Sequence, residues 1–201
     1  MTLRKMTASA ALAIGLATAG WGIAAIAGTA VAGASIRAAD ASLAASGTAQ
    51  PVSSQDRMFL DQASQINLTE ISLGRYIQAH ATTTTAKNLG GIYAHDHKAA
   101  QASLRALALR LHVTLPTTPG VQLECMVAQV EAQKGRNRDV AFARASVSGR
   151  QTAIAIFRKE QSAGSNPAVK TYAARYLPML QTHLCQSPGT VETFVAVIFR
   201  S

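Results

Sequence analysis

Four segments of the sequence each place one ionisable side chain on an otherwise apolar helical seam. These side chains are Glu70, His97, Arg150 and His183. An ionisable group on a buried seam is costly unless it is paired or bound to a metal. Ferritin-like bundles build metal centres from inward side chains on facing helices. Glu70, His97 and His183 are therefore candidate ligands for a divalent metal such as iron or zinc.

The stretch YAHDHKAAQ, residues 93–101, holds two of the five histidines. Positions two apart on a helix point about 200° away from each other, so His95 and His97 do not serve one site. His97 follows the apolar seam, whereas His95 faces away from it. Asp96 is next to His97 around the helix, and we expect it to orient a ligand's ring from outside the coordination sphere.

A buried polar network is the alternative to a metal centre. In this network Arg150 pairs with Glu70, and His97 bonds to the Glu70 carboxylate. A guanidinium is not a metal ligand and repels a cation. The Glu-x-x-His pairs of di-iron bundles are also absent, since Leu73 stands three residues after Glu70. Arg150 therefore favours the network, and the metal centre stays open beside it.

Apolar residues at helical spacing predict the elements that position these side chains. Caps and breakers mark the helix ends; Asp139 is expected to cap the third long helix, and Asn166 the fourth. Four long helices with short connections predict an all-α protein folded as an antiparallel four-helix bundle. The predicted long helices cover residues 54–81, 85–112, 139–163 and 167–186, and a shorter one covers residues 121–132.

The predicted helix ends give each polar side chain a height in the bundle. Counted from these ends, Glu70, His97 and Arg150 fall at nearly one level. His183 lies sixteen residues into its helix, which places it several ångströms away at about 1.5 Å per residue. A kink at Pro178 would bring it closer.

The N-terminal region is typical of an export signal. Arg4 and Lys5 precede a long uncharged run, and the sequence TAVAGA offers small residues for cleavage after Ala32 or Ala34. We expect residues 1–34 to be a signal peptide; the alternative is an uncleaved anchor, because the run is long enough to span a bilayer. The expected location is the periplasm or an outer-membrane-associated position.

The rest of the chain divides by composition. Residues 35–54 are rich in Ala, Ser and Thr and are expected to form a flexible, disordered linker. Residues 55–186 form the predicted bundle, and residues 187–201 form a C-terminal tail. The apolar stretch 190–199 in this tail is either a strand or an extension of the last helix.

The chain is basic, with 19 Lys and Arg against 10 Asp and Glu and a net charge of +9. Without residues 1–34, 17 basic and 10 acidic residues remain, a net charge of +7. This charge attracts anionic envelope surfaces or polymers. Nucleic acid is excluded as a partner, because no recognised motif or aromatic interleaving accompanies the charge. A polymer-binding face would require the arginines to cluster on one side: Arg105, Arg110, Arg136, Arg138 and Arg144.

The two cysteines are Cys125 and Cys185. In an oxidising compartment, an isolated pair favours a disulfide. The bundle topology is expected to place both cysteines at the same end, which supports that pairing over two free thiols. Neither cysteine belongs to a Cys-x-x-Cys motif, so redox catalysis is disfavoured.

The sequence resembles a bacterial exported family of unknown function, DUF4142, whose members carry an outer-membrane label. The similar motifs are Asn-x-x-Glu-Ile at 67–71, Asp96-His97, and Leu-Pro-x-Leu-x-x-His-Leu at 177–184. The likeness covers about residues 55–186, and the family's fold is taken as ferritin-like. The resemblance places Glu70, Asp96, His97 and His183 on the family's polar positions. The third long helix departs, because Arg150 stands where the family usually has a His.

Three functions remain. The favoured one is an exported, non-enzymatic, ferritin-like bundle of the cell envelope with weak metal binding or a stress-related role. A metal-dependent oxidoreductase with a degenerate carboxylate and histidine centre is the first alternative, and a basic binder of anionic envelope polymers is the second.

Overall fold

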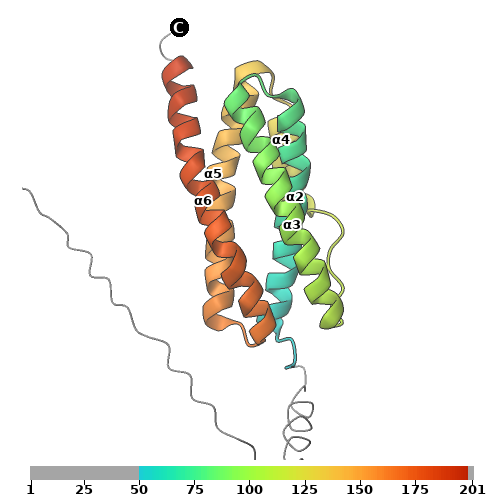
Figure 1. Cartoon of the computed structure of the whole chain (residues 1–201). Coiled ribbons are helices and arrows are strands. Elements are labelled where there is room, and N and C mark those ends of the chain that lie inside the picture. Colours follow the sequence, from blue (N-terminus) through green and yellow to red (C-terminus); the bar gives the residue numbers. More distant parts are fainter. Residues whose placement is uncertain (1–49, 199–201) are drawn as a thin grey trace, which may run out of the picture. The chain divides into compact units, whose positions relative to one another are not determined.

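A computed structural model describes residues 50–198 of the chain, with side chains through Ser187. The all-α prediction is confirmed for this part, which contains no strand. Four long helices run antiparallel, and a short helix lies beside them (Figure 1). The helices are α2 (Ser54–His80), α3 (Thr84–Arg110), α4 (Val121–Glu131), α5 (Gly135–Ala163) and α6 (Pro167–Ile198).

The long helices pack as two hairpins. The most extensive contacts join α2 to α3 and α5 to α6. Contacts between α2 and α5 and between α3 and α6 close the four-helix arrangement. The short α4 packs against α2 and α5. Within residues 50–198, no helix has the length and hydropathy needed to cross a bilayer.

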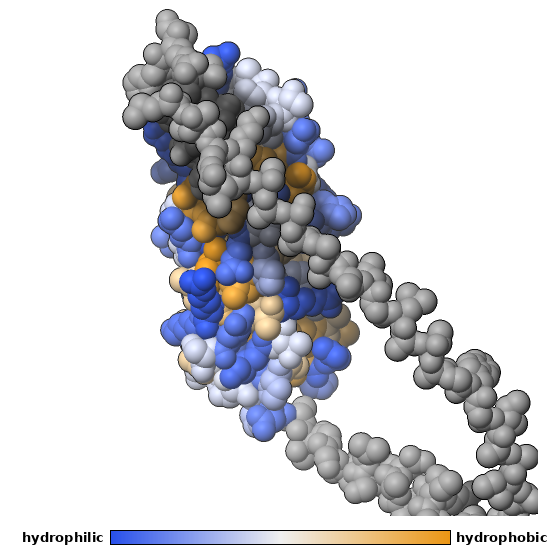
Figure 2. Space-filling model, turned by 60° about the vertical axis from the view of Figure 1, so that its left-hand side comes forward, coloured by the Kyte–Doolittle hydropathy of each residue, from blue (hydrophilic) through white to orange (hydrophobic). Residues whose placement is uncertain are grey.

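Two apolar clusters fill the interior. One cluster, around Phe59, Leu104 and Phe157, lies toward the end where α2 begins. The other, around Ile77 and Phe142, lies toward the α2–α3 turn. Outside, hydrophilic side chains flank a band of apolar ones on the face shown in Figure 2.

Between the two clusters lies a layer of buried polar side chains, which we call the polar layer. By position along each helix, the polar side chains of α2, α3 and α5 separate the residues of one cluster from those of the other. The polar layer consists of Ser64, Asn67, Glu70, His97, Gln101, Ser146, Arg150 and His183.

The helices α2 and α3 cross closely at two glycines. A Cβ on Gly74 would lie 2.6 Å from the backbone oxygen of Gly90, and a Cβ on Gly90 would lie 2.7 Å from the oxygen of Gly74. Real Cβ contacts are not this short, so both positions require glycine. The crossing lies one helical turn from Glu70 and two turns from His97, and it brings the backbones of α2 and α3 together beside the polar layer.

Side-chain caps close the N-terminal ends of α2, α3 and α6. Ser53 caps α2 in a capping box with Asp56, and the Asn166 side chain accepts from the Ala168 and Val169 amides at the start of α6. The predicted cap at Asn166 is therefore confirmed. Gln50 already accepts a hydrogen bond from Asn166 Nδ2, so the last residues of the predicted linker are fastened to the bundle. The predicted signal peptide and residues 35–49 of the linker lie outside the described residues.

The predicted cap at Asp139 is wrong. Helix α5 begins at Gly135, four residues earlier, with Lys134 at the N-cap position. The buried Asp139 carboxylate instead accepts from the Thr82 and Thr83 amides at 2.8–3.2 Å. Asp139 thus closes the α2–α3 turn from a neighbouring helix, where those amides have no intrahelical partner.

The predicted disulfide is also wrong. Cys125 and Cys185 are exposed free thiols. Cys125 belongs to α4, which packs on α2 and α5, whereas Cys185 belongs to α6, which packs on α5 and α3. A shared end of the bundle does not place two residues side by side when their helices pack on different neighbours.

The C-terminal segment is a helix rather than a strand. Helix α6 continues through Ile198, so the predicted tail from residue 187 is largely a continuation of the last helix. The extension alternative for residues 190–199 is thereby confirmed up to Ile198.

Candidate functional site

The centre of the polar layer is an ion pair between α2 and α5. Arg150 Nη1 donates to Glu70 Oε1 at 2.7 Å, and Arg150 Nη2 donates to Glu70 Oε2 at 2.9 Å. The two side chains are only 2% and 10% exposed. This bidentate geometry satisfies both carboxylate oxygens with charge-assisted bonds. It commits Glu70 to the guanidinium rather than to a metal ion.

Tyr93 supports the buried guanidinium from α3. The Arg150 guanidinium carbon lies 3.9 Å from the centre of the Tyr93 ring, a cation–π contact away from water. The Tyr93 ring also lies against His183, with centroids 4.6 Å apart, and its hydroxyl contacts Ser187 Oγ at 3.1 Å. Tyr93 therefore links the ion pair on α2 and α5 to the histidine on α6.

The tautomer of His97 follows from its partner. His97 Nδ1 lies 2.8 Å from Asn67 Oδ1. The Asn67 amide nitrogen donates to Gln101 Oε1 and to the Tyr172 hydroxyl, so Asn67 Oδ1 is the acceptor. His97 Nδ1 therefore carries the proton, and Nε2 presents a lone pair.

The tautomer of His183 follows in the same way. His183 Nε2 lies 3.0 Å from Asp96 Oδ2. Burial would raise the pKa of Asp96, but hydrogen bonds from His95 and His183 lower it on balance. Asp96 is thus an ionised acceptor of a hydrogen bond from His183 Nε2–H, and His183 Nδ1 presents the lone pair. His95 itself is exposed and contacts Asp96 Oδ1 at 3.1 Å.

Both buried rings are held neutral. Burial lowers the pKa of His97 well below its ordinary value, and the positive charge of Arg150 lowers it further. Burial also lowers the pKa of His183, although its bond to Asp96 opposes this shift. A neutral imidazole is the form that binds a metal ion.

The two histidine rings are neighbours in the core, and each has one nitrogen without a hydrogen-bond partner. Their centroids are 5.6 Å apart, and each residue is 1% exposed. His97 Nε2 and His183 Nδ1, the two lone-pair nitrogens, have no hydrogen-bond partner. Arg150 Nε and Ser146 Oγ are also buried without a partner. Such groups in a folded core call for an occupant, which is either water or an ion.

His183 is closer to its neighbours than the predicted heights allow. The predicted heights of Glu70 and His97 were counted from the turn between their helices, whereas that of His183 was counted from the start of the last helix. These reference points lie at opposite ends of the bundle. In the structure α2 and α6 begin at the same end, because Asp56 accepts from the Asn166 amide. Glu70 and His183 each lie sixteen residues after the first residue of their helices, which puts them at one level. His97 bonds to Asn67 rather than to Glu70.

Several members of the polar layer were missing from the predicted site. Asn67 bonds to His97, Gln101 accepts a hydrogen bond from Asn67, and Ser146 stands one turn before Arg150. Helical spacing could have identified two of them, because Asn67 precedes Glu70 by three residues and Gln101 follows His97 by four, which puts each on the same helix face as the predicted residue. An uncharged amide on a seam draws less attention than a charge, yet it sets the histidine tautomer here.

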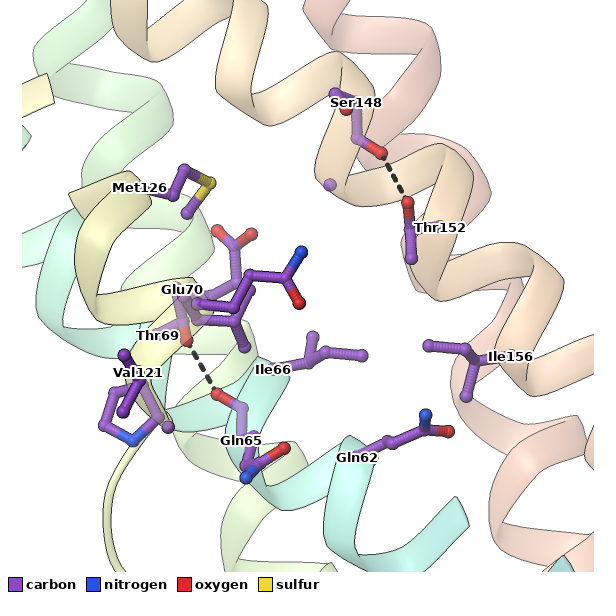
Figure 3. Close-up of a pocket in the computed structure, with 15 residues that line it drawn as sticks. Gln62, Gln65, Ile66, Thr69, Glu70, Val121, Met126, Ser148, Thr152 and Ile156 are labelled. Atoms are coloured by element: carbon purple, nitrogen blue, oxygen red, sulfur yellow. Dashed lines mark hydrogen bonds between the residues drawn. The ribbon is translucent and has the colours of Figure 1, made fainter. Parts of the chain in front are cut away.

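A cleft of about 460 Å³ borders the ion pair between α2, α5 and the start of α4 (Figure 3). Its lining is uncharged except for Glu70. Figure 3 shows Ile66, Met126 and Ile156 around the cavity with Glu70. Gly149 also lines it, and a Cβ there would meet only Glu70 Oε1, at 3.9 Å. The cleft therefore reaches Glu70, and neither His97 nor His183 lines it.

The family model "Domain of unknown function (DUF4142)" matches residues 41–187. The chain belongs to this family. No curated protein matches the chain. A solved structure, the crystal structure of a DUF305 fragment from Deinococcus radiodurans, is similar with a TM-score of 0.56 and 15% identity. The match covers 75% of this chain and 99% of that fragment, and at this identity it shows a shared fold alone.

In this DUF4142 chain, Arg150 is the residue that departs from the expected family pattern, and it pairs with Glu70. The resemblance puts a His at the position of Arg150, and the structure shows the guanidinium bound to the Glu70 carboxylate. Glu70 is therefore not available beside His97 and His183 as a third ligand. Within residues 50–187, no group of three His, Cys, Asp or Glu side chains is arranged to hold a metal ion.

The arginines proposed for polymer binding do not share one end of the bundle. Arg136, Arg138 and Arg144 belong to the first part of α5, beside the α2–α3 turn. Arg105 and Arg110 lie near the opposite end, where α3 finishes. The Arg138 guanidinium is already engaged within the protein, because it donates hydrogen bonds to the backbone oxygens of Gln133 and His80.

Proposed function

We propose that the protein is a non-enzymatic, exported helical bundle of the cell envelope that binds one transition-metal ion through His97 Nε2 and His183 Nδ1. The observation that carries this proposal is the pair of buried, unpartnered imidazole nitrogens on neighbouring rings. Imidazole nitrogen suits zinc, copper, iron and nickel. Two protein ligands make a weak site whose remaining positions are filled by water.

The outer contacts support ligation by these two rings. Metal-binding histidines commonly donate their second N–H to a carboxylate or a carbonyl oxygen, which fixes the ring and the tautomer. Asp96 accepts such a hydrogen bond from His183, and the Asn67 side-chain oxygen accepts one from His97. Each remaining lone pair is buried and free of competition from another hydrogen bond.

The charges of the polar layer together with that of the adjoining Asp96 also admit a cation. Glu70 and Asp96 contribute two negative charges, and Arg150 contributes one positive charge. With both histidines neutral, the net charge is −1. The bidentate contact with Glu70 offsets the repulsion that an unpaired Arg150 would exert on an ion.

Zinc titration of the full bundle tests the proposal. We expect wild-type protein, purified without an affinity tag, to bind about one equivalent of Zn²⁺ by calorimetry. His97→Gln should weaken this binding at least tenfold, because it removes one of two protein ligands. His80→Gln is the matched control, since His80 is exposed at the end of α2 and its side chain contacts none of the site residues, and it should bind Zn²⁺ as the wild type does.

Two results would contradict metal binding. One is the absence of saturable Zn²⁺ binding by a wild-type protein whose circular dichroism shows the helical fold. The other is equal weakening by His97→Gln and His80→Gln, which would assign the binding to surface histidines.

The proposed export rests on residues 1–34, whose sequence is typical of a signal peptide. We expect the protein isolated from the periplasmic fraction to begin at residue 33 or 35, measured by intact mass spectrometry. A membrane-bound form that retains Arg4 and Lys5 would instead support the anchor alternative.

A further inference from the structure

Two fully buried carboxyl groups adjoin each other at the end of the bundle where α2 and α6 begin. Asp56 lies in the first turn of α2, and Glu160 lies in the last turn of α5; both are 0% exposed. Neither belongs to the polar layer. The side chains of Asp56 and Glu160 interact directly. Two neighbouring ionised carboxylates repel strongly, so a buried pair of this kind favours having one of its members protonated.

Asp56 fastens two separate segments of the chain. Its Oδ1 accepts from the Ser165 and Asn166 amides at 2.9 and 3.1 Å, which closes the α5–α6 turn. Its Oδ2 accepts from Ser53 N and Ser53 Oγ at 2.7 and 2.6 Å. Asn166 in turn binds the Gln50 oxygen, so the arm of residues 50–53 and the turn meet at Asp56.

Glu160 is confined beside this junction. Gln55 Nε2 donates to Glu160 Oε2 at 3.2 Å, while Glu160 Oε1 is buried and has no partner. A Cβ on Gly164 would overlap the Glu160 carboxyl and its backbone oxygen, so the turn packs directly on this side chain. Lys170 on α6 is the cation that acts on Glu160.

We propose that Asp56 and Glu160 form a proton-operated clasp: protonated Glu160 holds the arm of residues 50–53 and the α5–α6 turn in place, and ionised Glu160 loosens both. Ionisation would set a second negative charge beside Asp56 in a site with one amide donor and one nearby lysine. The least costly relief is for the turn and the arm to move outward and admit water. The clasp thus couples external pH to the attachment of the N-terminal arm.

The titration range supports an effect near neutral pH. Burial raises the pKa of Glu160 to about 7, and the neighbouring Asp56 adds to this rise against Gln55 and Lys170. Burial alone would raise the pKa of Asp56, but the bonds from Ser53 and Asn166 lower it to about 2. The Glu160 pKa is about 7 in the closed state and has its ordinary value of 4.5 when the clasp is open. The closed state therefore loses stability as the pH rises from 4.5 through about 7. Asp56 stabilises the closed state throughout this range, because the stabilisation from its ionised carboxylate is lost only when the pH falls below its ordinary pKa of 3.8.

Hydrogen exchange at the Ser165 and Asn166 amides tests the clasp. In the full chain, we expect the opening constant of these amides, corrected for the intrinsic rate, to increase roughly 100-fold between pH 5 and pH 9. Glu160→Gln should show little pH dependence, because it keeps the shape of the side chain without the titration. Glu124→Gln, a matched change on an exposed carboxylate, should behave as the wild type does.

The wild type alone also decides the question if Glu160→Gln does not fold. A carbon-13 carboxyl titration should place the Glu160 midpoint near 7. A midpoint near 4.5, or an amide opening constant that stays constant from pH 5 to pH 9, would overturn the clasp. Equal pH dependence in a folded Glu160→Gln variant would overturn it as well.

Discussion

Replacing Glu70 with Gln should lower the free energy of unfolding by about 3–5 kcal/mol, because it leaves the Arg150 charge buried without a counter-charge. The guanidinium is 2% exposed and cannot lose its proton or reach water without opening the bundle. The cation–π contact with Tyr93 remains in this variant, but it does not replace a carboxylate. Urea unfolding of metal-free protein at pH 7 measures the loss.

A double variant separates the cost of a broken pair from the value of the intact one. Glu70→Leu with Arg150→Met removes both charges, and we expect its stability to be within about 2 kcal/mol of the wild type. Glu124→Gln controls for loss of a carboxylate at an exposed position and should change stability by less than about 0.5 kcal/mol. A Glu70→Gln variant as stable as the wild type would show that water reaches the guanidinium.

The second large effect concerns the crossing of α2 and α3. Gly90→Ala should destabilise the protein by about 2–4 kcal/mol, since its Cβ would lie 2.7 Å from the Gly74 oxygen and 2.9 Å from the Gln78 nitrogen. Both contacts are with backbone, so the helices themselves must separate. The same separation should lengthen the bond between His97 on α3 and Asn67 on α2, and therefore weaken zinc binding. Thermal unfolding and zinc calorimetry measure the two effects.

Gly91→Ala is the matched control at the next position of the same helix. Its Cβ would meet Gln78 Nε2 at 2.9 Å, which is the far end of a flexible side chain that moves away easily. Alanine has the higher helix propensity, by about 1 kcal/mol. Gly91→Ala should therefore leave stability unchanged or raise it slightly. Equal losses for both alanine variants would mean that the close backbone approach does not limit this crossing.

The fold was largely predictable because the helices are amphipathic and well capped. Periodic apolar residues predicted four of the five helices to within two residues of their starts, and Asn166-Pro167 marked the start of α6. The start of α5 was the exception. Asp139 is a good cap by type, but its carboxylate is taken by the amides of the α2–α3 turn, which lie far away in sequence.

The sequence predicted which charged residues and histidines form the candidate site, but not which of them contact one another. Spacing on the seams singled out Glu70, His97, Arg150 and His183, because a buried ionisable group stands out against apolar neighbours at helical period. Partner choice was not predictable in the same way. His97 bonds to Asn67 rather than to Glu70, a choice made by side-chain reach and rotamer across two helices.

By itself, the sequence determines that the chain forms long antiparallel helices with ionisable residues turned inward, because capping and apolar periodicity are local properties. Only the tertiary structure decides which of those residues meet. It joins Glu70 to Arg150, leaves one nitrogen free on each of His97 and His183, and separates Cys125 from Cys185. The physical reason is that pairing depends on the relative height and packing partners of the helices. Those are set by contacts such as Asp56 with Asn166 and Gly74 with Gly90, between residues far apart in the chain.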